Sequence, residues 1–265
     1  MRYGINKVWP WFKVAVPIVL AFFAVLNFEG IFDNWAGEFE VVVPNAPMSR
    51  QVRVPDRMFR MSVVGKKLVA LTFDDGPSAT TTSRLLDILY EKAAIATFFE
   101  LGSKMASNPE ISQRVAEQGH EIGSHTMWHQ NLIVVSRAAV REDIEKAKEV
   151  YREVLGKEVG IMRMPYGNSD GFVAEVVGVP LIYWTVDTRD WAVLNAQMVA
   201  DNAVGAVFDG AIVLMHDIYD STVDAVGVII DELRAQGYEF VTVSELAKIR
   251  GVTMNGGETY YSFRP

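Results

Sequence analysis

Cysteine is absent from this chain of 265 residues, and histidine occurs only four times. The absence of cysteine excludes disulfide bonds, thiolate zinc sites and a cysteine nucleophile. Basic residues are also scarce, since 25 Lys and Arg stand against 33 Asp and Glu, for a formal net charge of -8. A chain with this charge has no dominant basic surface, so no nucleic-acid partner is expected. Hydrophobic residues make up 50%, which predicts a folded globular protein.

The N-terminal segment has a charge pattern of its own. Arg2, Lys7 and Lys13 are the only charged residues before Glu29, and residues 14–28 form an apolar run. A basic start followed by such a run is typical of a signal peptide or a signal anchor, and no small-x-small cleavage site follows it. With the aromatic residues just upstream, the segment approaches the ~20 residues that a membrane helix needs. We therefore expect an uncleaved transmembrane anchor with the body outside the cytoplasm.

This pattern divides the chain into three regions. Residues 1–29 are expected to form a cytoplasmic foot and a signal anchor, residues 30–63 an extracytoplasmic stalk, and residues 64–265 the main domain. A buried hairpin of a soluble protein remains an alternative for the apolar run, although its flanking charges would then be accidental. The sequence contains no Asn-x-Ser/Thr sequon, which favours a bacterial protein. The anchor pattern then predicts a single-pass protein of the cell membrane.

From residue 66 onward, strand-like and helix-like stretches alternate. Strands are expected at 67–73, 96–101, 160–164, 181–185, 211–215 and 239–243, with a short strand-like stretch at 121–124. Helices are expected at 82–92, 109–118, 137–155, 195–204, 222–236 and 244–249. Such alternation implies parallel strands joined by helical crossovers. We predict an α/β fold, a distorted barrel of about seven parallel strands, because that number of strand–helix units fits the length better than an open sheet does.

Titratable side chains follow directly on several predicted strands. In barrels of parallel strands, functional residues gather where the strands end at their carboxyl edge. The residues in such positions are Asp74, Asp75, His125, Arg163, Asp187, Asp190, His216 and Asp217. We therefore expect one polar site at this rim.

His125 and His129 are four residues apart, so on one helical turn both imidazoles would face the same way and suit a divalent metal. A histidine pair alone is more often surface or core. Asp74 or Asp75 could supply a third ligand, and two histidines with one carboxylate and an open position are typical of hydrolytic zinc sites. The two aspartates also suit a simple turn, but a metal bound by one and a proton accepted by the other would explain both.

His216 lies beside Asp217, and Asp190 is expected at the same rim. A carboxylate partner keeps an imidazole protonated, as a general acid requires. The alternative is a hydrogen-bonded residue at a strand end with no catalytic role.

Five short motifs occur in order along the main domain. They are Thr-Phe-Asp-Asp-Gly-Pro at 72–77, Ser-His-Thr-Met-Trp-His at 124–129, Arg-Met-Pro-Tyr-Gly at 163–167, Asp-Thr-Arg-Asp-Trp at 187–191 and Leu-Met-His-Asp at 214–217. In these motifs the chain resembles the NodB-homology polysaccharide deacetylases, carbohydrate esterase family four, over about residues 60–265.

The resemblance implies a metal-dependent hydrolase with a base and an acid. Asp74 would be the general base that deprotonates water, and His216 the general acid that protonates the leaving amine. The implied metal ligands are Asp75, His125 and His129. The metal would be Zn²⁺ in most relatives and Co²⁺ or another divalent ion in some.

The resemblance also implies supporting roles. Arg163 would orient the base, and Asp190 would tune the acid. The backbone N–H of Tyr166 would stabilise the oxyanion together with the metal. Trp191 and Leu214 would line the pocket for the acetyl methyl group.

Some features fit the family less closely. His120 has no role in the motifs, so we expect it to be structural. Met164 stands where the family more often has proline, and the loop at 168–180 looks short. Both departures concern the substrate groove more than the reacting groups.

The resemblance implies that the chain is a polysaccharide deacetylase acting on N-acetylglucosamine units, with peptidoglycan the favoured polymer because an anchored enzyme meets the wall. The alternatives are a chitin or chitooligosaccharide deacetylase and an O-acetyl xylan esterase, since fold alone does not set substrate. An inactive wall-binding module is an alternative of another class, although the base, the acid and the ligands are all intact. A small-molecule amidohydrolase would be expected to lack an anchor. A monomer is favoured.

Overall fold

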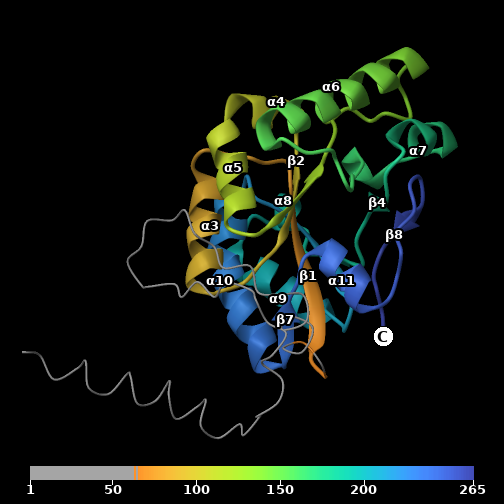
Figure 1. Cartoon of the computed structure of the whole chain (residues 1–265). Helices are drawn as coiled ribbons and strands as arrows, with labels where there is room; N and C mark the ends of the chain where they lie inside the picture. Colours follow the sequence, from red (N-terminus) through yellow and green to blue (C-terminus); the bar gives the residue numbers. More distant parts are fainter. Residues whose placement is uncertain (1–62, 64) are drawn as a thin grey trace, which may run out of the picture. The chain divides into compact units, whose positions relative to one another are not determined.

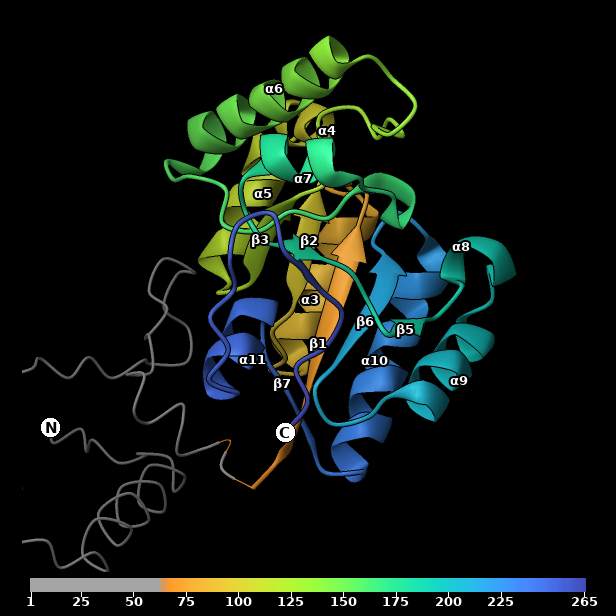
Figure 2. The same cartoon turned by 90° about the vertical axis from the view of Figure 1, so that its right-hand side faces the viewer.

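The computed structural model describes Val63 and residues 65–265. Its main sheet contains six strands in the order β3-β2-β1-β6-β5, with β7 also paired to β1. These strands are β1 (Lys67–Asp74), β2 (Thr97–Glu100), β3 (Glu121–Ser124), β5 (Val186–Asp187), β6 (Ala211–His216) and β7 (Tyr238–Phe240). Every pairing in this sheet is parallel, so the strands end at a common carboxyl edge (Figure 2).

Helices connect the strands and cover the sheet. They are α3 (Thr81–Glu91), α4 (Gly102–Ser107), α5 (Pro109–Glu117), α6 (Arg137–Leu155), α7 (Gly171–Val177), α8 (Asp190–Val193), α9 (Ala196–Ala206), α10 (Asp220–Ala235) and α11 (Val243–Ile249), with the 3-10 turn η2 (Pro165–Gly167). In Figures 1 and 2, α3 and α10 pack on one face of the sheet, and α11 lies on the other face. Helices α4, α6 and α7 lie beyond the carboxyl ends of the strands.

Strand β1 is the centre of the core because both of its faces are buried. Alternate residues Val69, Leu71 and Phe73 join the apolar cluster on one face, while Leu68 and Ala70 join the cluster on the other. This two-sided burial explains why the strand appears in the sequence as a continuous apolar run. Each fully buried large side chain here contributes ~1.5–3 kcal/mol to stability.

The predicted boundaries of the longest helix agree with the structure, where α6 covers Arg137–Leu155. Ser136 caps its N-terminus by accepting a hydrogen bond from the Ala139 N–H. Gly156 ends it in the left-handed conformation, with φ 66°. Both ends are therefore set by local residues, which sequence patterns describe well.

The expected α/β alternation with parallel strands is confirmed. The strands of the described residues do not pair continuously around a closed barrel, however, because they form two separate sheets. The strand expected at 160–164 is a single residue, Met162, which bridges Ser124 on one side and Leu181 on the other. The strand expected at 181–185 is shorter, because the chain leaves the sheet after β4 (Leu181–Ile182).

Strand β4 pairs with β8 (Thr259–Tyr260) in a separate two-stranded sheet. In the part of the chain that the structure describes, no strand pairing connects β4 to β5.

The segment at 168–180 was expected to be a loop, but most of it forms α7. The carboxylate of Asp170 caps this helix by accepting a hydrogen bond from the Val173 N–H at 2.8 Å. Gly178 then ends it with φ 67°. The helix has only 7 residues, so its periodic pattern was too short to predict it.

The predicted membrane anchor at 1–29 and the predicted stalk at 30–63 lie outside the described residues, apart from Val63. Among the helices of the described part, none is long and apolar enough to cross a membrane.

Candidate active site

A cavity of about 490 Å³ opens at the carboxyl edge of the main sheet. All five motif segments contribute to its lining. The predicted site residues that line it are Asp74, Asp75, His125, His129, Tyr166, Trp191, Leu214 and His216. The structure thus brings together residues from loops that are far apart in the sequence.

The other two predicted site residues, Arg163 and Asp190, lie behind the lining. Both side chains are fully buried, and each contacts a lining residue. Arg163 contacts Asp74, and Asp190 contacts His216. Their positions are those of residues that orient and tune other groups.

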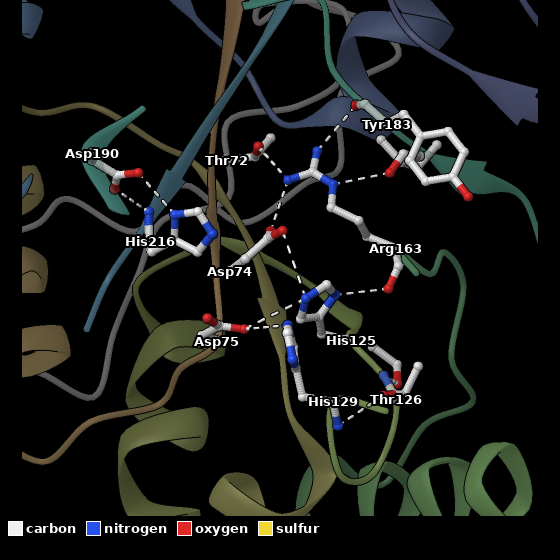
Figure 3. Close-up of polar contacts among 12 residues, drawn as sticks. Thr72, Asp74, Asp75, His125, Thr126, His129, Arg163, Tyr183, Asp190 and His216 are labelled. Carbon is white, nitrogen blue, oxygen red and sulfur yellow. Dashed lines mark hydrogen bonds and ion pairs between the residues drawn. The ribbon is translucent and has the colours of Figure 1, made fainter. Parts of the chain in front are cut away.

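Asp75, His125 and His129 form a compact group of potential metal ligands (Figure 3). Oδ1 of Asp75 lies 3.3 Å from Nε2 of His129 and 3.5 Å from Nε2 of His125. One ligand atom from each residue lies within 4.8 Å of the others. Two imidazole nitrogens and one carboxylate oxygen are a donor set that suits a divalent ion such as zinc.

Burial and hydrogen bonding prepare His125 for metal binding. Its Nδ1–H donates a hydrogen bond of 2.8 Å to the backbone carbonyl of Arg163, which leaves Nε2 unprotonated toward Asp75. Burial lowers the pKa of His125 to about 3, although the charge of Asp75 acts in the opposite direction. The ring is therefore neutral at physiological pH. A neutral imidazole fixed through its other nitrogen is the usual metal-binding form.

An unpaired oxygen provides an independent test of whether a cation fits here. Oδ1 of Asp75 is buried and has no hydrogen-bond partner in the described chain. A buried, unpaired carboxylate oxygen is costly unless a charge or a donor satisfies it. This oxygen is the atom that faces both imidazoles, so the residues present fit a divalent ion at this point.

His125 and His129 do not lie on a helix as expected. Thr126 and His129 have positive φ angles of 73° and 58°, so the segment is an irregular loop. The loop is held by the His129 N–H, which donates to Oγ1 of Thr126 at 3.3 Å. The two imidazoles still approach each other, with ring centroids 5.1 Å apart. The loop therefore brings the two imidazoles together, as a helical turn was expected to do.

Arg163 holds Asp74 from the buried side of the cavity. Its Nη1 donates to Oδ1 of Asp74 at 2.7 Å and to Oγ1 of Thr72 at 2.8 Å. Burial raises the pKa of Asp74, while the charge and the hydrogen bond of Arg163 act to lower it. Arg163 thus stabilises the ionised form of a carboxylate that burial would otherwise protonate.

Asp190 holds His216 on the opposite side of the cavity (Figure 3). Oδ1 of Asp190 lies 2.8 Å from Nδ1 of His216, and Oδ2 accepts hydrogen bonds from the His216 N–H and the Thr222 hydroxyl. Burial lowers the pKa of His216, but the hydrogen bond and charge of Asp190, with the charges of Asp74 and Asp75, raise it to about 9. The imidazole is therefore protonated at neutral pH.

Strained backbone gathers around this cavity. Of the seven non-glycine residues with positive φ in the described chain, all but Ala93 lie in or beside the motif loops. These are Asp75, Thr126, His129, Tyr166, Arg189 and Leu194. Such conformations cost ~1–3 kcal/mol each and persist where the surrounding structure requires them.

Several functional residues were missed from the sequence or only partly identified. Trp184 and Tyr219 line the cavity, although neither lies in one of the five motifs. Asp187 and Met164 also line it and were noticed in the sequence, but no role was predicted for either. Their position at or near the carboxyl ends of predicted strands was the available signal.

Asp217 supports the turn that carries Asp75. A Cβ atom on Gly76 would lie only 2.1 Å from a carboxylate oxygen of Asp217, so glycine is required there. The Thr82 hydroxyl donates to the same carboxylate at 2.5 Å and in turn accepts from the Ser78 N–H at 2.7 Å. These contacts hold the loop between β1 and α3 beneath the ligand group.

The rim of the cavity is aromatic and partly exposed. Tyr166 packs edge-on against His129, with centroids 4.8 Å apart, and Trp191 is half exposed. Leu214 lies at the wall of the cavity. His120 is remote from it: its Nδ1 accepts a hydrogen bond from the Ala96 N–H, as a structural residue would.

Comparisons with known proteins agree with this geometry. Residues 62–178 match the family model described as polysaccharide deacetylase. Over 74% of its length the chain is 42% identical to peptidoglycan-N-acetylglucosamine deacetylase PgdA of Listeria monocytogenes, and the match covers 41% of that protein. Over 70% of its length it is 37% identical to a peptidoglycan-N-acetylglucosamine deacetylase of Bacillus cereus, of which 90% is covered.

A solved structure is similar as well. The family 4 acetyl xylan esterase of Clostridium thermocellum, in complex with a cobalt ion, superimposes with a TM-score of 0.71 at 32% identity. The alignment covers 74% of this chain and 98% of the esterase.

The two aspartates are predicted to differ in their dependence on metal. Asp75→Ala removes a ligand and should lower zinc affinity by more than ~100-fold. Asp74→Asn should retain zinc and lower turnover by ~10²–10⁴-fold, because it removes the base and not a ligand. Metal content by elemental analysis and acetate release from an N-acetylated glycan measure the two effects. Loss of zinc from Asp74→Asn would show that this division of roles is wrong.

The Asp190–His216 pair predicts the basic limb of the pH profile. An acid must be protonated to act, so activity should fall as pH rises through the pKa of His216, near 9. Asp190→Asn removes the carboxylate that stabilises the imidazolium, so the limb should move to lower pH. The measurement is kcat across pH 5–10 for both proteins. An unchanged limb in Asp190→Asn would exclude this role for Asp190.

Proposed function

Because the chain belongs to the polysaccharide deacetylase family, we propose that it is a metal-dependent hydrolase that removes N-acetyl groups from N-acetylglucosamine units of peptidoglycan. The observation that carries this proposal is the arrangement of one cavity. Ligand atoms of Asp75, His125 and His129 face each other on one side, and protonated His216 stands on the other with Asp74 between them. The names of the Listeria and Bacillus relatives support the choice of polymer.

We propose zinc as the metal, held by Asp75, His125 and His129, with cobalt as an alternative that the related esterase structure supports. When bound, such an ion supplies a positive charge that polarises a carbonyl group and makes water more acidic. Asp75 contributes the single negative charge of the ligand group. His125 contributes a neutral nitrogen whose direction is fixed by the Arg163 carbonyl.

Proton transfer is the task of Asp74 and His216. Water adds to the acetyl carbonyl carbon while Asp74 accepts one of its protons, and Arg163 favours the ionised form of this carboxylate and orients it for the step. The carbon–nitrogen bond then breaks, and His216 donates its proton to the departing nitrogen. The products are acetate and the free amine of the sugar. Asp190 keeps His216 protonated before this second step.

The acetyl group needs an apolar recess and a donor for its oxygen. Trp191 and Leu214 line the cavity and are proposed to receive the methyl group. Tyr166, held at φ 61°, is proposed to direct its backbone N–H to the developing oxyanion. Both roles depend on the substrate entering with its acetamido group toward the ligand side.

Acetate release from three polymers tests the proposed function. Zinc-loaded protein should release acetate from purified peptidoglycan glycan strands faster than from chitopentaose or acetylated xylan. Chelation should reduce the rate by more than ~100-fold, because the ligand group then lacks its ion. Asp74→Asn serves as the inactive control. Faster release from xylan acetate or chitopentaose would assign one of the alternative substrates, and no release from any polymer would favour an inactive binding module.

We also propose that residues 1–29 anchor the enzyme in the cell membrane, with the catalytic domain on the outer side. The support is the sequence pattern alone, with three basic residues before the apolar run at 14–28. Full-length protein should sediment with membranes and resist a high-salt wash, whereas a chain that begins at Arg50 should remain in the supernatant. Salt-extractable full-length protein would contradict the anchor.

A further inference from the structure

Arg189 lies at the rim of the cavity, outside its lining. Its guanidinium carbon is 5.8 Å from the ring centroid of Trp191, and the Trp191 ring lines the cavity. Arg189 itself is exposed to solvent. Arg189 is therefore next to the place where an acetamido sugar would bind, in a position to contact the adjacent sugar of the same polymer.

The guanidinium of Arg189 has no carboxylate partner within Val63 and residues 65–265. Arg84, Arg114, Arg152 and Arg250 are paired with acidic side chains. The other exposed or half-exposed arginines of the described part, Arg137, Arg141, Arg234 and Arg264, contact aromatic rings, and they lie away from the cavity lining. All five N–H donors of Arg189 thus remain available to a ligand.

The backbone at Arg189 is held in place. Its N–H donates to Oδ1 of Asp187 at 2.8 Å, and its φ and ψ are 56° and 28°. The preceding Thr188 is buried, and its hydroxyl donates to the Leu214 carbonyl at 2.9 Å. A cation presented from a fixed backbone loses less conformational entropy when it binds an anion than one on a mobile loop.

The charge of the cavity explains why a cation at this point matters. Asp74, Asp75 and Asp187 line the cavity, and none of its described lining residues is Lys or Arg. The carboxylates of the cavity oppose an anionic group on the polymer, whereas protonated His216 and a bound ion act in the opposite direction. In peptidoglycan, the sugar next to N-acetylglucosamine carries a lactyl group with a carboxyl or a peptide, whereas chitin has no such group.

We propose that Arg189 binds a carboxylate on the sugar next to the one that is deacetylated, and so selects anionic wall glycan over neutral chitin-like chains. The inference rests on the proposed function and specifies its substrate. A planar guanidinium can bind a carboxylate through two parallel hydrogen bonds, which a lysine cannot do. Arg189 would thus act in binding, remote from the reacting atoms.

The test compares one glycan in two charge states. Peptide-free peptidoglycan strands with free lactyl carboxylates, and the same strands after amidation, are given to the zinc-loaded full-length chain at low salt. In Arg189→Gln, the ratio of kcat/KM for the free over the amidated strands should fall ~3–10-fold, mainly through KM, because one exposed charge-assisted pair is lost. The ratio measured for Arg189→Lys should lie between that of Arg189→Gln and that of the original protein. The difference in this ratio between the original protein and Arg189→Gln should become smaller as the salt concentration rises.

Arg152→Gln is the matched control, since it removes an equal charge from α6, where Arg152 pairs with Glu158. Its ratio should equal that of the original protein. Acetate release from amidated strands shows that each variant is folded. An unchanged ratio in Arg189→Gln overturns the inference alone. If the original protein releases acetate from neither glycan, the proposed function fails, and the inference fails with it.

Discussion

Arg163 is the residue on which the rest of the site depends. Its fully buried guanidinium donates to Asp74 and Thr72 of β1. It also donates to the backbone carbonyls of Ile182, the last residue of β4, and of Tyr183 directly after it. Its own carbonyl accepts the hydrogen bond that orients His125. A buried charge of this kind is stable only with excellent geometry and complete hydrogen bonding. The same contacts that stabilise Arg163 therefore align Asp74, the proposed base, and His125, a proposed metal ligand.

The two histidines show how environment divides roles within one cavity. Burial keeps His125 neutral, with a pKa lowered to about 3, so its free nitrogen can bind a metal ion. His216 is partly buried, but the hydrogen bond and charge of Asp190, with the charges of Asp74 and Asp75, raise its pKa to about 9 and keep it charged. The same type of side chain is thus suited to bind a metal ion at one wall and to donate a proton at the other, which are the two roles proposed here. The difference comes from the complete burial of His125 and from the carboxylate of Asp190, which is hydrogen-bonded to the ring of His216.

The residues proposed to react and the residues proposed to select the substrate differ in their burial. The groups proposed to react are held by buried partners, Arg163 and Asp190, which fix their direction. The rim is formed by partly exposed side chains such as Tyr166 and Trp191, beside the unpaired Arg189. Rigid elements supply precise geometry, whereas exposed loops tolerate changes that alter the substrate. Related enzymes with different named substrates on one fold are consistent with this division.

The sequence by itself determined the elements whose signals are local. The apolar run of β1, the capped helix α6 and the polar residues at strand ends were all predicted, because periodicity and capping act within a few residues. The family resemblance identified the candidate site residues and implied that Arg163 orients Asp74. Only the tertiary structure reduced the strand at 160–164 to one bridge and placed His125 and His129 on an irregular loop with positive φ angles. It also supplied the geometry of the contact between Arg163 and Asp74, 89 positions apart, because such contacts depend on packing between elements and leave no pattern in neighbouring residues.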